Sequence, residues 1–241
     1  MFHATMKYQR IELRLHQLAN LLADPARCSM LVSLLDRRAL TAGELALRAN
    51  VSPQAASAHL TKLTGRRLIT VETQGRHRYF RLANAEVAEM LEAFGKVCVL
   101  PDASDRGEQS PVLDSLRFAR SCYDHLAGKL AVDLTDAMLR SKWVTMGADE
   151  FKLNAKGRER LMIFGLDIDR LAHQRRSFAR RCLDWTERRP HVAGALGGAL
   201  LERVQHLKWV VPLRGSRALR VTQAGLRGFE REFGVRLPMM S

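Results

Sequence analysis

The first half of the chain carries helix-starting residues at short intervals. Asp24 precedes a proline, Thr41 is followed three residues later by Glu44, and Ser52 again precedes a proline. In each arrangement a side-chain oxygen can accept a hydrogen bond from an amide of the first helical turn, which otherwise lacks a partner. These starts leave room only for helices of roughly two to four turns. The chain therefore has to fold here as a set of short, closely connected helices.

Apolar stripes predict which face of each helix is buried. The first and fifth predicted helices share one pattern, with apolar residues at i, i+4, i+7 and i+11. The stripe residues are Ile11, Leu15, Leu18 and Leu22 in the first helix, and Val87, Leu91, Phe94 and Cys98 in the fifth, which Asn84 caps. Both segments are expected to be amphipathic helices.

The fourth predicted helix, which Ser52 starts, has an outward face of unusual composition. Its inward stripe is Ala56, Leu60 and Leu63. The outward positions are small, polar or cationic, and they are Gln54, Ser57, Ala58, Thr61 and Lys62. A helix needs such a face to lie against base pairs between two phosphate walls, whereas a solvated helix more often shows Glu/Lys pairs.

Two β-rich runs, 68–72 and 78–82, flank Gly75 and predict a hairpin. Its tip is basic, with Arg76, His77 and Arg78 in succession. Cations placed just after a candidate recognition helix can follow phosphates or enter a minor groove. The alternative is that the tip is only a solvated turn.

The order of these motifs resembles the ArsR/SmtB family of winged helix-turn-helix repressors over about residues 8–99. The resemblance is carried by Asp24-Pro25-x-Arg27, Glu44-Leu45-Ala46, Ser57-x-His59-Leu60-x-x-Leu63 and Gly75-Arg-x-Arg-Tyr79. It implies a homodimer built by the first and last helices, with the Ser57 helix reading a near-palindromic operator in duplex DNA. His59 is expected at the rim of that helix, touching phosphate. The residues expected to contact DNA are Ser52, Gln54, Ala55, Ser57, Ala58, His59, Thr61, Lys62, Arg76, His77, Arg78 and Tyr79.

The family's usual metal sites are not carried over. Positions 44–47 read Glu-Leu-Ala-Leu and positions 86–92 read Glu-Val-Ala-Glu-Met-Leu-Glu, where metal-sensing members have their ligands. No resident metal or cofactor is therefore expected. A metal ion, an oxidant or a small organic molecule as effector stays open.

Beyond a Pro-, Asp- and Ser-rich linker at 100–111, the chain repeats itself. His125-Leu-Ala-Gly128 matches His191-Val-Ala-Gly194, and Lys142-Trp-Val144 matches Lys208-Trp-Val210, both at a spacing of 66 residues (191 − 125 and 208 − 142). Each copy reads helix, His-x-Ala-Gly, helix, a short Trp-containing strand, turn, strand and closing helix. We expect a mainly helical α+β chain with small β-hairpins. Its parts are a winged helix for DNA binding and dimerisation over 1–99 and a duplicated sensing or assembly domain over 112–241. The second part consists of two tandem winged-helix-like repeats at about 112–166 and 167–236.

Three residue types recur at equivalent places in the two copies, and they are Cys122 and Cys182, Asp124 and Asp184, and His125 and His191. Pseudo-symmetry could bring them around one cleft, and a soft-metal or redox sensor would recruit these residue types. The alternative is that they hold the shared fold, with the cysteines as small core residues. Aromatic side chains are expected to pack in the core, although a pocket for an organic effector could use them as walls: Tyr123, Trp143, Trp185 and Trp209.

Composition narrows the partners and the compartment. The net charge of +14 favours a polyanion, and the 6% aromatic content argues against a stacking platform for single strands. The sequence has no export signal, no membrane span and no Cys-x-x-Cys, so we expect reduced thiols and a cytoplasmic protein. The sequence contains no phosphate loop, nucleophile elbow or His-Glu metal motif, so we expect no enzymatic activity. The alternatives are a non-specific architectural DNA protein and a DNA-binding domain fused to an unrecognised enzyme, which could use Cys122/His125 or Cys182/His191.

Overall fold

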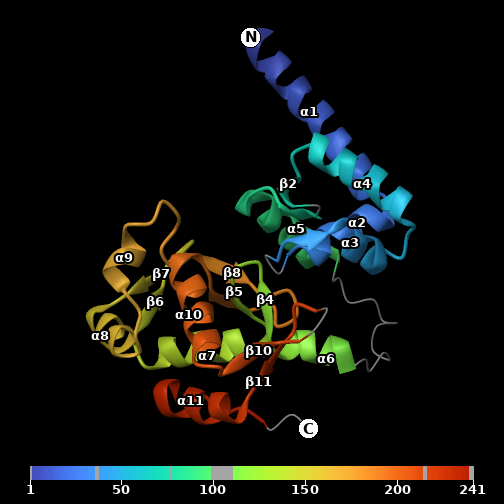
Figure 1. The fold of residues 1–241 in the computed structure, drawn as a ribbon. Coiled ribbons are helices and arrows are strands. Elements are labelled where there is room, and N and C mark those ends of the chain that lie inside the picture. Colours follow the sequence, from blue (N-terminus) through green and yellow to red (C-terminus); the bar gives the residue numbers. More distant parts are fainter. Residues whose placement is uncertain (1, 36–37, 76, 99–110, 214–215, 239–241) are drawn as a thin grey trace, which may run out of the picture. The chain divides into compact units, whose positions relative to one another are not determined.

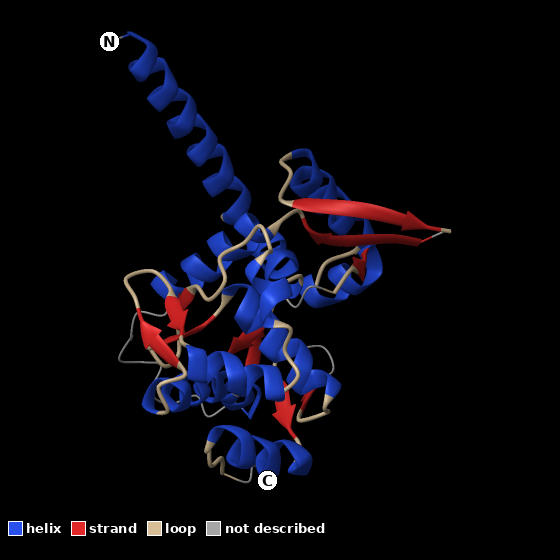
Figure 2. Ribbon diagram, turned by 90° about the vertical axis from the view of Figure 1, so that its left-hand side faces the viewer, coloured by secondary structure: helices blue, strands red, loops and turns tan. Residues whose placement is uncertain are grey.

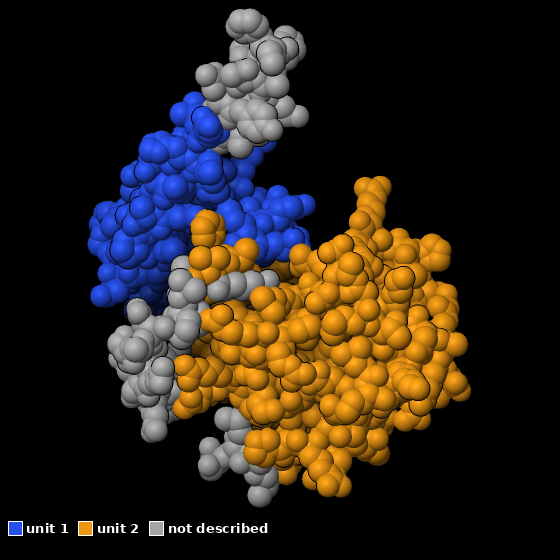
Figure 3. Space-filling view, turned by 180° about the vertical axis from the view of Figure 1, so that it is seen from behind, with its two compact units in different colours: residues 1–91 blue, residues 92–241 orange. Residues whose placement is uncertain are grey.

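The computed structural model describes residues 2–35, 38–75, 77–98, 111–213 and 216–238. The chain divides into two compact units, 1–91 and 92–241, which are coloured separately in Figure 3. Residues 100–110 of the predicted linker lie outside the described residues, and a helix begins at Pro111, its last predicted residue. In the described part of the chain, no helix has the length and apolar character that a bilayer crossing requires.

The first unit is the predicted winged helix. Its helices are α1 (Phe2–Leu22), α2 (Pro25–Ser33), α3 (Ala42–Ala49), α4 (Pro53–Gly65) and α5 (Ala85–Cys98), of which α5 continues into the second unit. Its strands are β1 (Leu40–Thr41), β2 (Ile69–Gln74) and β3 (His77–Leu82), and they form an antiparallel sheet in the order β1-β3-β2.

The predicted helix starts are confirmed by their hydrogen bonds. The Asp24 side chain accepts from the amide of Arg27 at 2.9 Å, and Ser52 accepts from the amide of Ala55 at 3.2 Å. Thr41 starts α3 with a complete capping box, in which its hydroxyl accepts a backbone amide while a carboxylate three residues later accepts the Thr41 amide. Local side-chain chemistry therefore fixes where these helices begin.

The predicted stripes of the first unit are only partly buried. Leu31, Leu45 and Leu63 are fully buried, as expected for the centre of its core. In contrast, Leu15 on α1 is 62% exposed and Phe94 on α5 is 46% exposed. The side chains of Ile11 and Cys98 lie outside the described residues. Amphipathicity predicts that a face prefers contact, but it does not say whether the contacting surface belongs to the same chain.

The second unit repeats one order of elements twice (Figure 1). The first copy consists of α6 (Pro111–Phe118), β4 (Arg120–Cys122), β5 (His125–Ala127), α7 (Lys129–Arg140), β6 (Val144–Met146), β7 (Phe151–Leu153) and α8 (Ala155–Ile163). The second consists of α9 (Ile168–Ala172), β8 (Arg181–Leu183), β9 (Pro190–Val192), α10 (Gly194–His206), β10 (Val210–Pro212), β11 (Leu219–Val221) and α11 (Gln223–Phe233). Both copies thus follow the same order of elements among the described residues. Each repeated Cys and His lies in a two-stranded hairpin that the sequence pattern did not predict.

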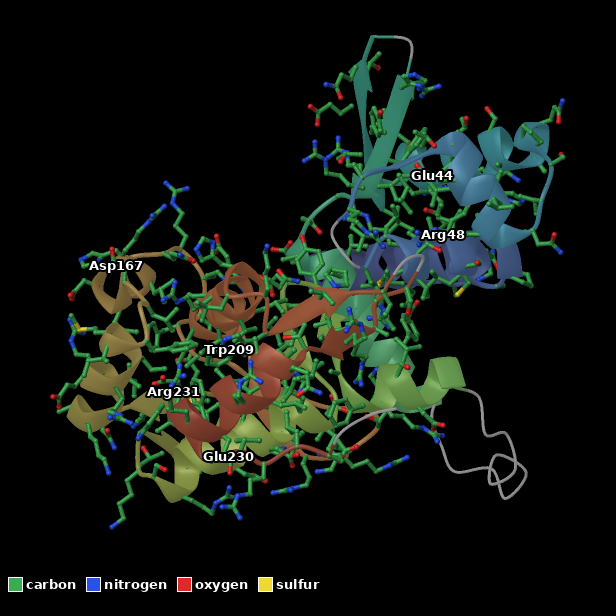
Figure 4. All side chains as sticks on the ribbon, turned by 60° about the horizontal axis from the view of Figure 1, so that its bottom comes forward. Glu44, Arg48, Asp167, Trp209, Glu230 and Arg231 are labelled. Atoms are coloured by element: carbon green, nitrogen blue, oxygen red, sulfur yellow. The ribbon has the colours of Figure 1, made fainter. Side chains whose placement is uncertain are left out.

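The two copies exchange contacts and share one core. Helix α7 of the first copy packs on β9 of the second, and α10 packs on β5. The backbone shows the same exchange, since the amide of Ser121 donates to the carbonyl of Arg217 and the amide of Arg181 donates to that of Asp149. Trp209, labelled in Figure 4, lies buried in this shared core with its ring 5.1 Å from that of Phe229. The copies therefore form a single pseudo-symmetric body.

Candidate functional site

The exposed face of α4 carries the residues expected to read DNA. Gln54, Ser57, Ala58, Thr61 and Lys62 are all exposed, and so is the capping Ser52. The Thr61 hydroxyl donates to the backbone carbonyl of Ser57 at 2.9 Å, which leaves its lone pairs as acceptors. Within the described residues, α4 thus presents a small polar surface with a cation near its C-terminal end.

His59 and Ala55 lie between the exposed and the buried face of α4, and both side chains are half-buried. The Nδ1 atom of His59 lies 3.4 Å from the Arg27 guanidinium and 3.8 Å from a carboxylate oxygen of Asp24. Arg27 also donates to the carbonyls of Asn20 and of the next residue, so its charge stabilises the end of α1. The structure therefore joins His59 to the junction of α1 and α2.

Strands β2 and β3 form a hairpin that extends away from the helices of its unit (Figure 2). Gln74 and His77 are its last paired residues, and Arg76 at the tip lies outside the described residues. His77 and Arg78 are exposed, whereas Tyr79 is half-buried. The Arg78 guanidinium lies 5.5 Å from the centre of the Phe80 ring. The described residues at the tip of this hairpin therefore carry basic side chains that are exposed to solvent.

In the second unit the structure brings together the side chains that the repeat singled out. Cys122 lies directly opposite His125 in the β4–β5 hairpin, and Cys182 lies directly opposite His191 in the β8–β9 hairpin. A directly opposed pair places its two side chains on the same face of a hairpin. Because β5 contacts β9, the two cysteine–histidine pairs face one another.

The resulting cluster is compact and buried. The Sγ atoms of Cys122 and Cys182 lie 3.9 Å apart, and the Nε2 atoms of His125 and His191 lie 3.1 Å apart. One ligand atom from each of the four residues can be chosen so that all lie within 4.8 Å of one another. None of the four residues is more than 6% exposed. Four donor atoms of two types therefore converge on one small volume.

A carboxylate lies behind each imidazole. Nδ1 of His125 lies 3.1 Å from Oδ1 of Asp124, and Nδ1 of His191 lies 3.7 Å from Oδ2 of Asp184. Asp184 is held by Arg120, which donates to it at 2.9 Å. Nδ1 of His191 is buried without a hydrogen-bond partner among the described residues. The cluster therefore has an outer ring of fixed carboxylates.

The surroundings shift the pKa values of these groups. Burial raises the pKa of Asp184, but Arg120, the Thr186 hydroxyl and the Gly128 amide outweigh it and bring the value to about 2. The hydrogen bond with Cys122 holds the pKa of the Cys182 thiol below its ordinary value, and both imidazoles act in the same direction. The same hydrogen bond, together with burial, raises the pKa of Cys122. The two neighbouring thiols therefore differ in acidity, and the pKa of Cys182 is the lower.

Sequence reasoning missed Arg120, which is 1% exposed and links the copies through Asp184. Its guanidinium also lies 4.5 Å from the Trp185 ring. A signal was present, because Phe118-Ala119-Arg120 recurs as Phe178-Ala179-Arg180 at a spacing of 60 residues (180 − 120). An arginine lies two residues before the cysteine in both copies, buried in the first and half-buried in the second, and this recurrence could have marked Arg120 as part of the cluster's support.

Comparison with known proteins agrees with the arrangement of the first unit. A family model described as a helix-turn-helix domain matches residues 22–72. The chain is 40% identical over 222 residues to YdfF of Bacillus subtilis strain 168, described as an uncharacterized HTH-type transcriptional regulator. The match covers 92% of this chain and 97% of that protein, so it includes both units.

Three solved structures that resemble this chain each match about two fifths of it. Reduced HlyU from Vibrio cholerae is 26% identical, with 39% of this chain and 98% of that chain covered and a TM-score of 0.36. The cadmium metal-sensor CMTR from Mycobacterium tuberculosis is 31% identical, with 40% and 94% covered and a TM-score of 0.31. The homodimeric winged helix-turn-helix domain of Mb0332 from Mycobacterium bovis is 20% identical, with 42% and 89% covered and a TM-score of 0.34.

Proposed function

This chain belongs to the HTH-type transcriptional regulators, and we propose that it is an effector-responsive repressor that binds a near-palindromic operator as a homodimer. Residues 1–99 carry DNA binding and dimerisation in this proposal, and residues 112–241 carry sensing. The protein acts in the cytoplasm and performs no catalysis. The observation that carries the proposal is the polar, exposed face of α4 beside a basic hairpin.

Base reading is assigned to α4 because its exposed side chains can donate and accept hydrogen bonds without bulk. Gln54 has the amide that pairs bidentately with adenine, and Ser57 pairs with several bases. We assign Lys62 on α4 and Arg78 on the β2–β3 hairpin as phosphate contacts. Such contacts orient the helix but do not specify sequence. His59 is already engaged by Arg27, so its part is to set the α4–α2 junction and to meet phosphate at the rim.

Dimerisation is assigned to α1 and α5 because both leave large apolar side chains in solvent. Leu13 is 59% exposed and Leu15 is 62% exposed on α1, and Val97 is 66% exposed on α5. Burying each of these side chains in a partner contributes about 1.5–3 kcal/mol. A two-fold dimer presents two copies of α4, which requires two half-sites related by the same symmetry.

The effector is assigned to the second unit because the buried cysteine–histidine cluster lies there. Regulation requires the effector to bind one state of the dimer better than the other. Zinc, arsenite and peroxide are the probes that this cluster suggests, and operator affinity at fixed salt should change with at least one of them. If none alters DNA binding, the sensing part of the proposal is wrong while the DNA-binding part stands.

Binding-site selection from a random duplex library tests the DNA-binding part. The full chain should enrich an inverted repeat, and its affinity for that repeat should exceed its affinity for random duplex by about 10³-fold or more at the same salt concentration. A ratio near one would leave only the phosphate contribution and would favour an architectural DNA protein.

A further inference from the structure

The buried cluster has the geometry of a coordination site. We propose that Cys122, His125, Cys182 and His191 together bind one zinc-type divalent cation with tetrahedral coordination. The proposal goes beyond the DNA-binding function and does not depend on it, because metal can be held whether or not it alters operator affinity.

The distances between the ligand atoms are close to those of a tetrahedral zinc site. A tetrahedral zinc ion with Zn–S bonds of about 2.3 Å and Zn–N bonds of about 2.05 Å holds two sulfurs about 3.8 Å apart and two nitrogens about 3.3 Å apart. The corresponding distances are 3.9 Å between the sulfurs and 3.1 Å between the Nε2 atoms. A tetrahedral site of these bond lengths separates each sulfur from each nitrogen by about 3.5 Å. Since the four ligand atoms already lie within 4.8 Å of one another, no sulfur–nitrogen pair needs to contract by more than about 1.3 Å.

The orientation of the two imidazoles also favours a bound cation. If Nδ1 of each ring carries the proton that faces its carboxylate, both Nε2 atoms present lone pairs to one another at 3.1 Å. Two such lone pairs repel unless a cation lies between them. A proton on Nε2 of His191 would relieve this repulsion but would turn a bare Nδ1 toward Asp184. Carboxylates behind ligating histidines are the usual outer shell of zinc sites, because they fix the tautomer and orientation of each ring.

The net charge of the buried cluster also fits a divalent cation. Two thiolates and one divalent cation sum to zero, which is the condition for burying charges in a site that is almost closed to water. The outer carboxylates have their own cations, since Asp184 pairs with Arg120 and Asp124 pairs with Arg176. The ligands are soft and borderline donors, a set that selects zinc-type ions over magnesium or calcium.

A disulfide between the two cysteines explains less. The sulfurs would have to approach from 3.9 Å to about 2.05 Å, and the converging imidazoles would have no part in the bond. A metal ion uses all four residues and also explains why each repeat supplies one cysteine and one histidine. The ion would join the two copies at their pseudo-symmetry axis and so stabilise the second unit against unfolding.

Titration of the reduced, metal-free full chain with Co²⁺ provides the first test. We expect saturation at about one ion per chain, with the visible bands of tetrahedral Co²⁺ and a thiolate charge-transfer band, and displacement of both by Zn²⁺. Cys122→Ser and Cys182→Ser should each weaken Co²⁺ binding and reduce the charge-transfer band, because one of the two thiolates is lost. Asp124→Asn should weaken Zn²⁺ binding by about 10- to 100-fold. The matched controls are Cys28→Ser on α2 and His173→Gln on the surface, which should bind like the wild type.

X-ray absorption of the zinc-loaded wild type provides a test that needs no variant to fold. The account predicts a shell of two sulfurs and two nitrogens, and zinc should protect Cys122 and Cys182, but not Cys28, from alkylation. Three results would overturn the proposal: folded, reduced protein that takes up neither ion, an absorption shell without sulfur, or loss of Co²⁺ uptake in the Cys28→Ser control equal to that in the two cluster variants. If the reduced protein bound no metal and formed a Cys122–Cys182 disulfide on reoxidation, the cluster would be assigned to redox chemistry instead.

Discussion

Nε2 of His125 lies 3.1 Å from Nε2 of His191, although 66 residues separate them in the chain. Neither repeat contains this pair alone, because each hairpin supplies one histidine opposite one cysteine. The duplication has therefore created a four-residue cluster on the axis that relates the copies. Because this cluster lies where the two copies meet, a ligand bound there can alter the rigidity of the whole second unit.

Two substitutions on α4 should separate sequence reading from phosphate binding. Gln54→Ala should reduce the preference for operator over random duplex by about 1–3 kcal/mol, because an amide that pairs with a base edge is lost. Lys62→Ala should weaken binding to both duplexes equally and lower the salt slope by about one. Fluorescence anisotropy at several salt concentrations measures both effects.

Lys156→Ala is the matched control for the lysine change, since Lys156 is exposed on α8 in the second unit. It should leave the affinity and the salt slope unchanged. Equal losses from Lys62→Ala and Lys156→Ala would show that overall charge, and not the α4 surface, determines binding.

Local signals predicted most of the first unit. Asp24, Thr41 and Ser52 start their helices as expected because a helix cap depends on residues only two or three positions away. The place of His59 could not be predicted in the same way. Its contact with Arg27 spans 32 residues and depends on how α2 packs against α4.

The second unit was predicted in outline and not in detail. Identical residues revealed the duplication, with a spacing of 60 between Cys122 and Cys182 (182 − 122) and of 66 between His125 and His191 (191 − 125). The short hairpins β4–β5 and β8–β9 were missed because three-residue strands are too short for an alternating pattern. The exchange of α7 and α10 between the copies is a tertiary property that no local pattern encodes.

Phe94→Glu should produce a monomer. Phe94 is 46% exposed, so the change should leave the fold of the single chain intact while placing a charge in the proposed dimer contact. Operator affinity should fall by roughly 10²-fold, because the two half-sites are no longer bound by linked modules. Sedimentation velocity and anisotropy measure the two results. Ile163→Glu, at a 70% exposed position on α8, is the control and should stay dimeric.

Arg27→Ala should destabilise the first unit by about 1–3 kcal/mol, since it leaves the carbonyls of Asn20 and Leu21 without their charged donor. Urea unfolding followed by circular dichroism gives the free energy of unfolding. Arg14→Ala on the exposed face of α1 should change that free energy by less than about 0.5 kcal/mol. Equal effects of the two changes would remove Arg27 from the α1–α2 junction.

The capping box of α3 should give a small acid dependence. The Thr41 backbone amide, and then its hydroxyl, hold the pKa of Glu44, labelled in Figure 4, below its usual 4.5. The stability that this carboxylate contributes is therefore fully present above pH 4.5 and is lost as the pH falls through the lower folded value. Glu44→Gln should remove about 0.5 kcal/mol or less at neutral pH, because the group is exposed, and the difference should shrink as the pH falls below 4.5. A pH-independent difference between the two proteins would contradict this assignment.

Footprinting of the full chain on the DNA upstream of its own gene tests whether α4 reads sequence. We expect one protected region with two inverted half-sites centred about 10 base pairs apart, and loss of that protection with Gln54→Ala at the same protein concentration. Uniform protection along the fragment, or an unchanged footprint with Gln54→Ala, would contradict a sequence-reading role for α4.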